Sequence, residues 1–398
     1  MGKISESELE VVEELDSLGR RTGVEVDDEQ ASGTDQADHS GDAIREPFDP
    51  EQIDVVTRNT AVELLLSRIR TKRVDLHPDF QRQAGIWKPT VKSRLIESLL
   101  LRIPLPTFYA AEGDDDVWSM VDGSQRLTAI AQFIEPASIG QPPLRLTDLE
   151  YLGKEYNGKT FEDLPGRLQT RLRETELIVH LIRRGTPEEV KFNIFARINT
   201  GGLPLSRQEL RHALIPGKGR DILRDWAASD AFRSATGNSV RSERMVDREM
   251  ILRFLAFRLT DPFAYRQDDF DRFLRDSMHK LNDLSDERVA ALRSDFERAM
   301  AAAEDIFGEY AFRKLDPSGG RRRLPINKAL FEAVSVNLAL VSDEVVERLI
   351  AEREDVIRLF RRLMGNVDFQ AAISQGTGHP AKVRERFLRI RRAFEGKS

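Results

Sequence analysis

Hydrophobic residues recur at regular intervals along most of this chain, and the interval changes once, near residue 187. Between residues 53 and 186, strand-like alternation and helix-like spacing of apolar positions follow one another. From residue 187 onward the helical spacing dominates. We therefore predict an α+β domain over residues 51–186 and an all-α helical domain over residues 187–398. Residues 1–50 are predicted to be an acidic, largely disordered tail, because residues 22–50 contain few large apolar side chains.

Within the α+β domain the pattern predicts specific elements. Residues 107–112 and 117–121 alternate as strands around the acidic turn 113–116, which predicts a hairpin, and residues 176–184 predict a further strand. Helices are expected over 62–70, with Asn59 or Thr60 as the N-cap, over 92–103, where Pro104 ends the helix, and from Leu127 to Phe133.

The helical domain begins with two predicted helices over 187–200 and 205–215, the second with Ser206 and Glu209 as a capping box. Further helices are predicted over 247–260, 267–282, 286–306, 326–341, 343–364 and 380–395. Segment 216–221 is predicted to be a loop that ends a helix, and segment 319–325 a basic turn, either a solvated loop or a contact with DNA phosphates. In the tail, the spacing of the apolar residues Ile4, Leu9, Val12 and Leu15 predicts a short amphipathic helix.

Charge and composition narrow the class of protein. Residues 1–50 hold four basic and fifteen acidic side chains, a net charge of −11, which leaves +5 for the remainder of a chain whose total is −6. A mildly basic body is compatible with nucleic acid or nucleotides as partners. The absence of cysteine excludes disulfides and thiolate zinc sites. No signal-peptide pattern and no long apolar run occur, so we expect a cytoplasmic, soluble protein without a membrane partner.

The segment "VDGSQRLTAI", residues 121–130, concentrates the most suggestive chemistry. A strand that ends at its start and a helix that follows it would point backbone N–H groups of a helix N-terminus at an anion. Gly123 would allow close approach, Arg126 would offer a planar fork for phosphate, and Asp122 would hold Mg²⁺ or orient a water. The alternative is that Asp122 and Gly123 mark a hairpin turn.

Two other polar clusters are candidates for the same site. In the first, Gln81 and Arg82 lie between Phe80 and Trp87, a combination that stacks on bases and forms hydrogen bonds with them. The plainer alternative is that both aromatics belong to the core. In the second cluster, Arg197 and Asn199 precede two glycines. The six histidines have no metal-ligand spacing, and no Walker-type phosphate loop is present.

Four segments in this order, "DFQRQAGIW", "LIESLLLRIPLPTFY", "VDGSQRLTAI" and "IFARINTGGLPLSRQELRHAL", resemble the domain-of-unknown-function family numbered 262. This family supplies the N-terminal module of GmrSD-type modification-dependent restriction enzymes and of the phosphorothioate-sensing effector SspE. The resemblance spans about residues 56–215 and implies a ParB/sulfiredoxin-like fold. The family's DGQQR signature falls on Asp122 to Arg126, with Ser124 in place of the usual glutamine.

The resemblance implies a stand-alone family member, associated with restriction and phage defence, that binds and hydrolyses a nucleoside triphosphate with Mg²⁺ and couples this to sensing of DNA, including modified DNA. Catalysis would rest on Asp122, Gln125 and Arg126, with Asp122 as the metal ligand. The nucleotide-binding residues would be Gln81, Arg82, Gly123, Ser124, Arg126, Thr128, Arg197 and Asn199.

The histidine nuclease module of the restriction enzymes is absent, so a nuclease or other defence protein is an expected partner, and an oligomer is compatible with the sequence. Two alternatives stay open: a non-catalytic DNA-binding or adaptor protein switched by nucleotide, and a metal-dependent ParB-like nuclease.

Overall fold

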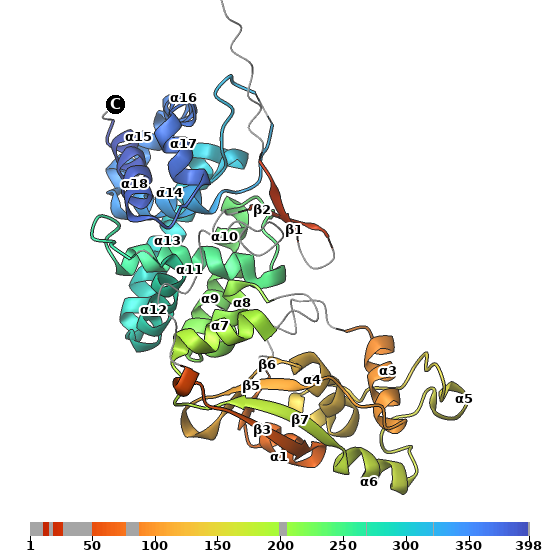
Figure 1. Ribbon diagram of the computed structural model, residues 1–398. Helices are drawn as coiled ribbons and strands as arrows, with labels where there is room; N and C mark the ends of the chain where they lie inside the picture. Colours follow the sequence, from red (N-terminus) through yellow and green to blue (C-terminus); the bar gives the residue numbers. More distant parts are fainter. Residues whose placement is uncertain are drawn as a thin grey trace, which may run out of the picture. The chain divides into compact units, whose positions relative to one another are not determined.

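The computed structural model describes residues 11–15, 19–26, 50–76, 87–198, 205–267, 269–320 and 322–396. The chain divides into two compact units (Figure 1). One, the α/β unit, comprises Ile44–Leu214, and the other, the helical unit, comprises Met1–Ala43 together with Ile215–Ser398. The α+β class followed by a helical part is as predicted, but the boundary predicted between residues 186 and 187 lies inside the α/β unit. The two helices that follow it belong to this unit because one of them packs on the sheet.

The described residues of the α/β unit form a mixed five-stranded sheet in the order β3–β7–β5–β6–β4. The strands are β3 (Val55–Ala61), β4 (Val74–Asp75), β5 (Phe108–Glu112), β6 (Trp118–Asp122) and β7 (Glu176–Ile182). β5 and β6 form the predicted antiparallel hairpin, and β5 pairs in parallel with β7. The predicted caps Asn59 and Thr60 are wrong, because both lie in β3, where each pairs with a residue of β7. Pairing of distant strands has overridden their capping preference.

Helices of the α/β unit pack against this sheet and against one another. They are α1 (Val62–Arg70), α3 (Pro89–Leu100), α4 (Ser124–Ile134), α5 (Gly153–Tyr156), α6 (Gly166–Glu174), α7 (Glu188–Ile198) and α8 (Arg207–Leu214), with 3₁₀ turns at Pro50–Gln52, Asp114–Asp116 and Pro136–Ile139. Apolar side chains of α1, α3, α4 and α6 share one core with alternate residues of β5, β6 and β7, such as Phe108, Met120 and Val179. Helix α8 packs against β6. Helix α8 therefore contacts the strand that leads directly into the N-terminus of α4.

The helical unit follows the predicted succession of helices with a few differences. Its helices are α9 (Lys218–Ala227), α10 (Asp230–Ala235), α11 (Val246–Leu259), α12 (Phe270–Asp283), α13 (Asp286–Phe307), α14 (Lys328–Leu340), α15 (Asp343–Ala351), α16 (Arg353–Met364), α17 (Val367–Ser374) and α18 (Pro380–Phe394), with 3₁₀ turns at Glu243–Met245 and Gly308–Tyr310. The helix predicted over 343–364 is divided near Glu352 into α15 and α16. The loop predicted over 216–221 is wrong from Lys218 onward, because α9 begins there after Gly217.

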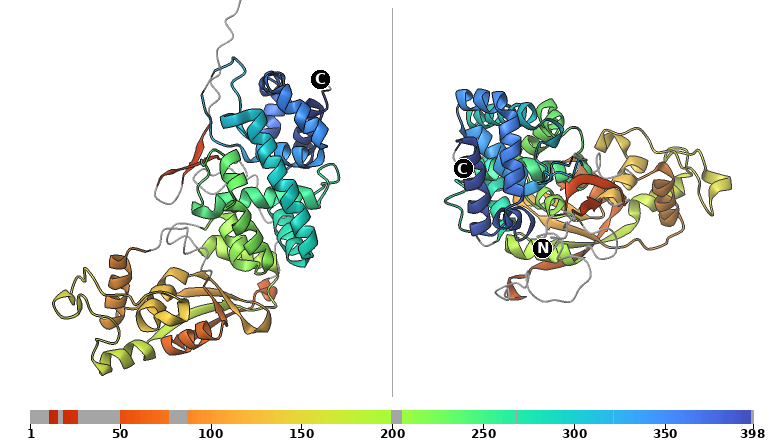
Figure 2. Two further views of the ribbon diagram at one scale, coloured as in Figure 1. Left: turned by 180° about the vertical axis from the view of Figure 1, so that it is seen from behind. Right: turned by 90° about the horizontal axis from the view of Figure 1, so that it is seen from above.

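Part of the predicted tail is ordered. The strands β1 (Glu13–Leu15) and β2 (Arg21–Glu25) pair with each other and lie beside helices of the same unit (Figures 1 and 2). Val24 is fully buried, bridges Ile326, and lies next to Glu25, which binds Lys314. The helix predicted around Val12 and Leu15 is therefore wrong there, because contacts with residues some 300 positions away favour an extended chain. Ile4 and Leu9 of the same prediction, and residues 27–49, lie outside the described residues.

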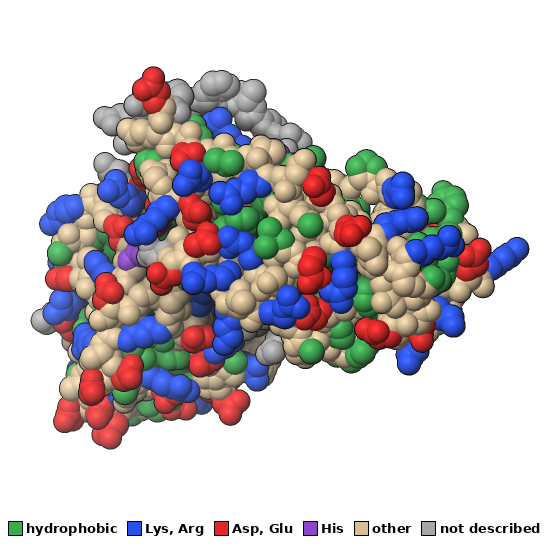
Figure 3. Space-filling model, turned by 90° about the horizontal axis from the view of Figure 1, so that it is seen from below, with side chains coloured by type: hydrophobic (Ala, Val, Ile, Leu, Met, Phe, Trp, Pro, Cys, Tyr) green, Lys and Arg blue, Asp and Glu red, His purple; other side chains and the backbone are tan. Residues whose placement is uncertain are grey.

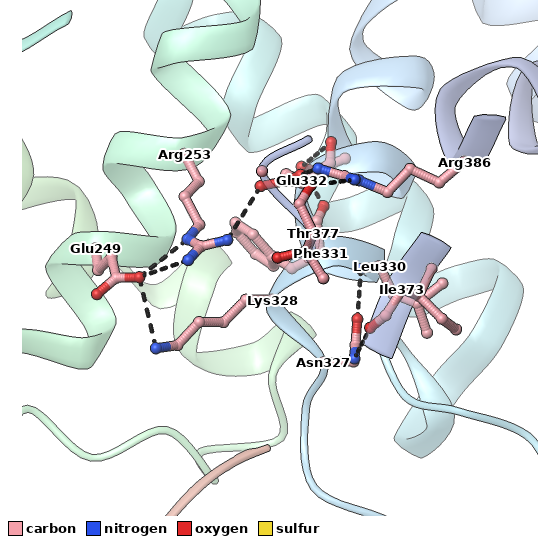
Figure 4. A network of polar contacts seen from close by, with 12 residues as sticks. Glu249, Arg253, Asn327, Lys328, Leu330, Phe331, Glu332, Ile373, Thr377 and Arg386 are labelled. Atoms are coloured by element: carbon pink, nitrogen blue, oxygen red, sulfur yellow. Dashed lines mark hydrogen bonds and ion pairs between the residues drawn. The ribbon is translucent and has the colours of Figure 1, made fainter. Parts of the chain in front are cut away.

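A buried ionic network joins α11, α14 and α18 (Figure 4). The carboxylate of Glu332 binds Arg386, and both side chains are fully buried. Glu332 also lies 3.5 Å from Arg253, whose guanidinium binds Glu249 at 2.9 Å. Charges removed from water in this way require partners. The network therefore fixes the register of α14 against the two helices, α11 and α18, that pack on it.

Candidate functional site

The turn between β6 and α4 is built around one glycine. Gly123 has φ of +90°, a left-handed conformation, and a Cβ placed there would lie 2.4 Å from Cδ1 of Phe108. Only glycine fits both conditions without strain. Helix α4 begins at Ser124, earlier than the predicted Leu127, so Ser124, Gln125 and Arg126 form its first turn. Gly123 is the N-cap and supplies no side-chain acceptor, so the first N–H groups of α4 have no side-chain cap.

Arg126 is held tightly on one side of this turn. Its guanidinium donates to the backbone oxygen of Pro106, to that of Thr107 at 3.2 Å and to Oδ2 of Asp122 at 2.9 Å. It also lies over the ring of Phe108, 4.6 Å from the centroid. The side chain of Arg126 is 12% exposed, whereas that of Asp122 is 40% exposed. Asp122 therefore presents a carboxylate to solvent while Arg126 is largely enclosed.

Burial and pairing act on Arg126 in opposite directions. Burial lowers the pKa of the Arg126 guanidinium, and the charge and hydrogen bond of Asp122 raise it in part, leaving a pKa below the ordinary arginine value. Arginine stays protonated at neutral pH in any case. The site thus holds an enclosed positive charge with one partner that can be displaced.

The other predicted residues of the loop have distinct environments. Nε2 of Gln125 is buried and has no hydrogen-bond partner within the described residues. Thr128 is buried and its hydroxyl donates to the backbone oxygen of Ser124 at 2.8 Å, so it stabilises the first turn of α4. Ser124 itself is 6% exposed.

A small cavity adjoins the start of α4 on the side that faces α8. It is lined by residues from the end of β6, from the start of α4 and from α8 with the residue preceding it: Met120, Val121, Ser124, Leu205, Glu209, His212 and Ala213. The predicted capping box at the start of α8 is confirmed. Glu209 accepts the N–H of Ser206 at 2.5 Å, and Ser206 Oγ accepts the N–H of Glu209 at 3.1 Å.

Sequence reasoning did not assign His212 or Glu209 to the site. Both are buried, and both line the cavity beside Ser124. The helical spacing of positions 209, 212 and 213 on one face of α8 is the only sequence signal that could have suggested this arrangement.

The two other clusters fall mostly outside the described residues. Phe80, Gln81, Arg82 and Asn199 lie outside the described residues. Arg197 lies in the last turn of α7 and is exposed. Trp87 is partly buried against the core of the α/β unit, in agreement with the structural alternative for that residue.

The residues of the turn Asp122–Arg126 can be compared with what a Mg²⁺–nucleotide complex requires. No group of three or more histidine, aspartate or glutamate side chains that could hold a metal ion occurs in the part of the chain that the structure describes. Mg²⁺ bound with a nucleotide needs fewer protein ligands, because the phosphates supply oxygens and one or two carboxylates suffice. The half-exposed Asp122 beside an uncapped helix N-terminus meets that requirement.

Comparison with known proteins identifies the region that contains this turn. Residues 62–216 match the model of the family described as GmrSD restriction endonuclease, N-terminal domain, and this part of the chain is therefore similar to that domain. The resemblance predicted over about residues 56–215 is confirmed over nearly the same span. No curated protein matches the chain. Among the described residues, no helix is long and apolar enough to cross a membrane.

Proposed function

We propose that this protein is associated with restriction and defence against phage, and that its α/β unit binds a nucleoside triphosphate with Mg²⁺ at the turn Asp122–Arg126 and hydrolyses it in response to DNA. The match of residues 62–216 to an N-terminal domain of restriction endonucleases supports the association. The observation that carries the nucleotide proposal is the uncapped N-terminus of α4 with an arginine and a carboxylate beside it.

The ion pair between Asp122 and Arg126 could open when a nucleotide binds, so that each side chain takes a new partner. A phosphate at the start of α4 would take the place of Asp122 on the guanidinium, since planar arginine binds phosphate oxygens well. Asp122, released from Arg126, would then hold Mg²⁺. In this way one ion pair of the free protein is replaced by two favourable contacts in the complex.

The remaining residues of the turn have roles that follow from their environments. The N–H groups of Ser124 and Gln125 would bind phosphate oxygens, helped by the helix dipole. The unpaired amide of Gln125 would orient the attacking water or the nucleotide. Mg²⁺, when bound, would neutralise phosphate charge as the terminal phosphate leaves. Gln81, Arg82, Arg197 and Asn199 stay predicted contacts of the nucleotide.

Phosphate release tests this proposal. ATP, GTP, CTP and UTP are each incubated with Mg²⁺, with and without duplex DNA, for the wild type and for Asp122→Asn. We expect release by the wild type, stimulation by DNA, and a loss of at least tenfold in the variant, because the amide is a poor ligand for Mg²⁺. Normal turnover by Asp122→Asn would remove Asp122 from the site.

DNA as a partner is supported by the domain type and by the positive excess of residues 51–398, +5. On the face shown in Figure 3, Lys and Arg side chains are interspersed with Asp and Glu. The excess is therefore not gathered into a single basic patch on that face. Binding that weakens steeply as salt rises would indicate phosphate contacts.

A second candidate is a nucleotide-switched adaptor that binds DNA or a partner protein and does not hydrolyse the nucleotide. The contacts of Arg126 with Pro106 and Thr107 favour it, because a change of partner at the guanidinium from Asp122 to phosphate could be passed on to the segment before β5. Nucleotide binding without phosphate release would select this candidate. The metal-dependent nuclease stays a prediction, and cleavage of plasmid DNA with Mg²⁺ or Mn²⁺ would test it.

A further inference from the structure

Strand β2 lies between two loops of the helical unit, and together they form one surface. The N–H of Arg241, in the loop after α10, donates to the backbone oxygen of Thr22 at 3.0 Å. On the other side of β2, the N–H of Ile326 donates to the backbone oxygen of Gly23 at 2.9 Å. β2 and α10 lie close together in Figures 1 and 2. Three segments that are distant in the sequence therefore meet here.

Arginine side chains from all three segments are exposed on this surface. We call them the arginine surface: Arg20, Arg21, Arg241, Arg322 and Arg323. Arg20 lies 3.0 Å from Glu243, and Arg21 lies 3.6 Å from Glu13. The other three arginines form no ion pair with any described residue. Positive charge on this surface therefore exceeds the carboxylates that pair with it.

A buried arginine joins the two loops. Arg313 is 5% exposed, and its guanidinium donates to the backbone oxygens of Leu324 at 2.5 Å and Thr236 at 3.2 Å and to Oγ of Ser239 at 2.6 Å. These acceptors are neutral, and Arg313 forms no ion pair within the described part of the chain. A full positive charge is thus held beside the exposed arginines with hydrogen bonds but without a carboxylate.

The nearby charges act on Arg313 unequally. Burial and then the positive charge of Arg323 lower the pKa of the Arg313 guanidinium to about 10, and the charges of Glu13 and Glu309 offset this only in part. Arg313 stays protonated at neutral pH. Repulsion between Arg313 and Arg323 costs stability, which a solvated loop does not require and which a bound anion would relieve.

Phosphate groups are the anions that fit this arrangement. The planar guanidinium forms two parallel hydrogen bonds with phosphate oxygens, and arginines without a carboxylate partner can form them without first breaking an ion pair. The exposed arginines come from three segments, so they suit a ligand with several phosphates in succession. The backbone of a nucleic acid has this form.

We propose that the arginine surface binds the phosphate backbone of duplex DNA, as a contact made by the helical unit in addition to the turn Asp122–Arg126 of the α/β unit. Such contacts position a protein on DNA without reading its bases. The inference rests on the proposed function in taking DNA as the partner, which the similarity of residues 62–216 to a domain of restriction endonucleases supports. It does not depend on nucleotide turnover.

Fluorescence anisotropy with a labelled duplex of about 30 base pairs tests the surface on the full chain. The test variant is Arg241→Gln/Arg322→Gln/Arg323→Gln. Each phosphate contact contributes about 0.9 to the slope with which log affinity falls against log salt concentration. We expect the variant to lower this slope by about 2–3, and to lower the affinity at about 0.1 M salt by at least about tenfold.

A second triple variant controls for the loss of charge. Arg224, Arg293 and Arg391 are side chains of the helical unit that are 36–55% exposed, and each lies 2.7–3.1 Å from a carboxylate three or four positions away. Their joint replacement by glutamine changes the net charge by the same amount. We expect it to change the affinity by less than about twofold, because these arginines already have partners. Thermal unfolding of both variants checks that they fold.

The outcomes separate the surface from the function on which it rests. If the wild type binds DNA and the test variant binds it equally well, the arginine surface is wrong while DNA stays the partner; this result is expected if the arginines contact an acidic protein instead. If both triple variants lose affinity equally, the effect reflects overall charge and the assignment to this surface is wrong. If the wild type does not bind DNA, that part of the proposed function fails and the inference fails with it.

Discussion

Removing Arg126 should destabilise the α/β unit far more than removing its partner Asp122. Arg126→Ala loses charge-assisted hydrogen bonds to the backbone oxygens of Pro106 and Thr107 and the contact with the ring of Phe108. Bonds of this kind contribute roughly 1.5–3 kcal/mol each where they are buried. We discount them for partial exposure and expect a loss of about 3 kcal/mol in the free energy of unfolding.

Asp122→Asn should cost much less. The carboxylate is 40% exposed, and ion pairs in contact with water contribute only about 0–1 kcal/mol. Asparagine can also accept the same hydrogen bond from Arg126. We therefore expect the free energies of unfolding of Arg126→Ala and Asp122→Asn to differ by at least about 2 kcal/mol, because Arg126 has backbone partners that Asp122 lacks.

Scanning calorimetry of the full chain measures this difference. For a unit of this size, 1 kcal/mol corresponds to about 2–4 °C in the unfolding temperature, so Arg126→Ala should lower the transition of the α/β unit by about 6–12 °C. Asp122→Asn should lower it by no more than about 4 °C. Equal shifts for the two variants would refute the reasoning that Arg126 is held by the backbone before β5. The result also bears on function, because activity lost in Arg126→Ala can reflect structure alone.

Three further variants test other parts of the fold. Gly123→Ala should destabilise the α/β unit by about 2–4 kcal/mol, because a left-handed backbone and a contact with Phe108 both oppose a Cβ; a change under about 0.5 kcal/mol in denaturant unfolding would contradict this. Burial raises the pKa of Asp247 to about 6, so the neutral form is favoured on folding, and stability present below the unfolded pKa is lost as pH rises through about 6. Asp247→Asn should therefore raise the unfolding temperature of the helical unit at pH 8. It should also make that temperature depend less on pH between pH 4 and 7. An unaltered dependence on pH would show that Asp247 does not titrate in this range. Glu332→Gln should lower the free energy of unfolding by about 3–5 kcal/mol, because it leaves Arg386 buried without its carboxylate partner. Replacement of both Glu332 and Arg386 by apolar residues should lower it much less, and unfolding of the single and double variants measures the difference.

Local patterns predicted much of the α/β unit because local contacts determine it. The β5–β6 hairpin, helix α4 and the capping box of Ser206 and Glu209 all depend on residues a few positions apart. The turn at Gly123 was recognisable because a glycine between a strand and a helix has few other uses.

Distant contacts explain what the sequence did not reveal. Arg126 binds carbonyl groups about 20 residues before it, and no spacing rule indicates such partners. Glu97 lies on the buried side of α3, where its carboxylate accepts the N–H groups of residues 150–152. Burial raises the pKa of Glu97, but these three bonds together outweigh it and hold the pKa below the ordinary value. The docking of Val24 against Ile326 likewise depends on the complete fold.

Turnover at the Asp122–Arg126 turn is the central claim of this account, and a single comparison tests it most directly. Phosphate release from the four nucleoside triphosphates with Mg²⁺ is measured for the wild type and Asp122→Asn, in parallel with nucleotide binding and with duplex DNA present or absent. We expect the wild type to release phosphate faster when DNA is present, and we expect Asp122→Asn to lose this release while the protein remains folded. Release that continues undiminished in Asp122→Asn would contradict it.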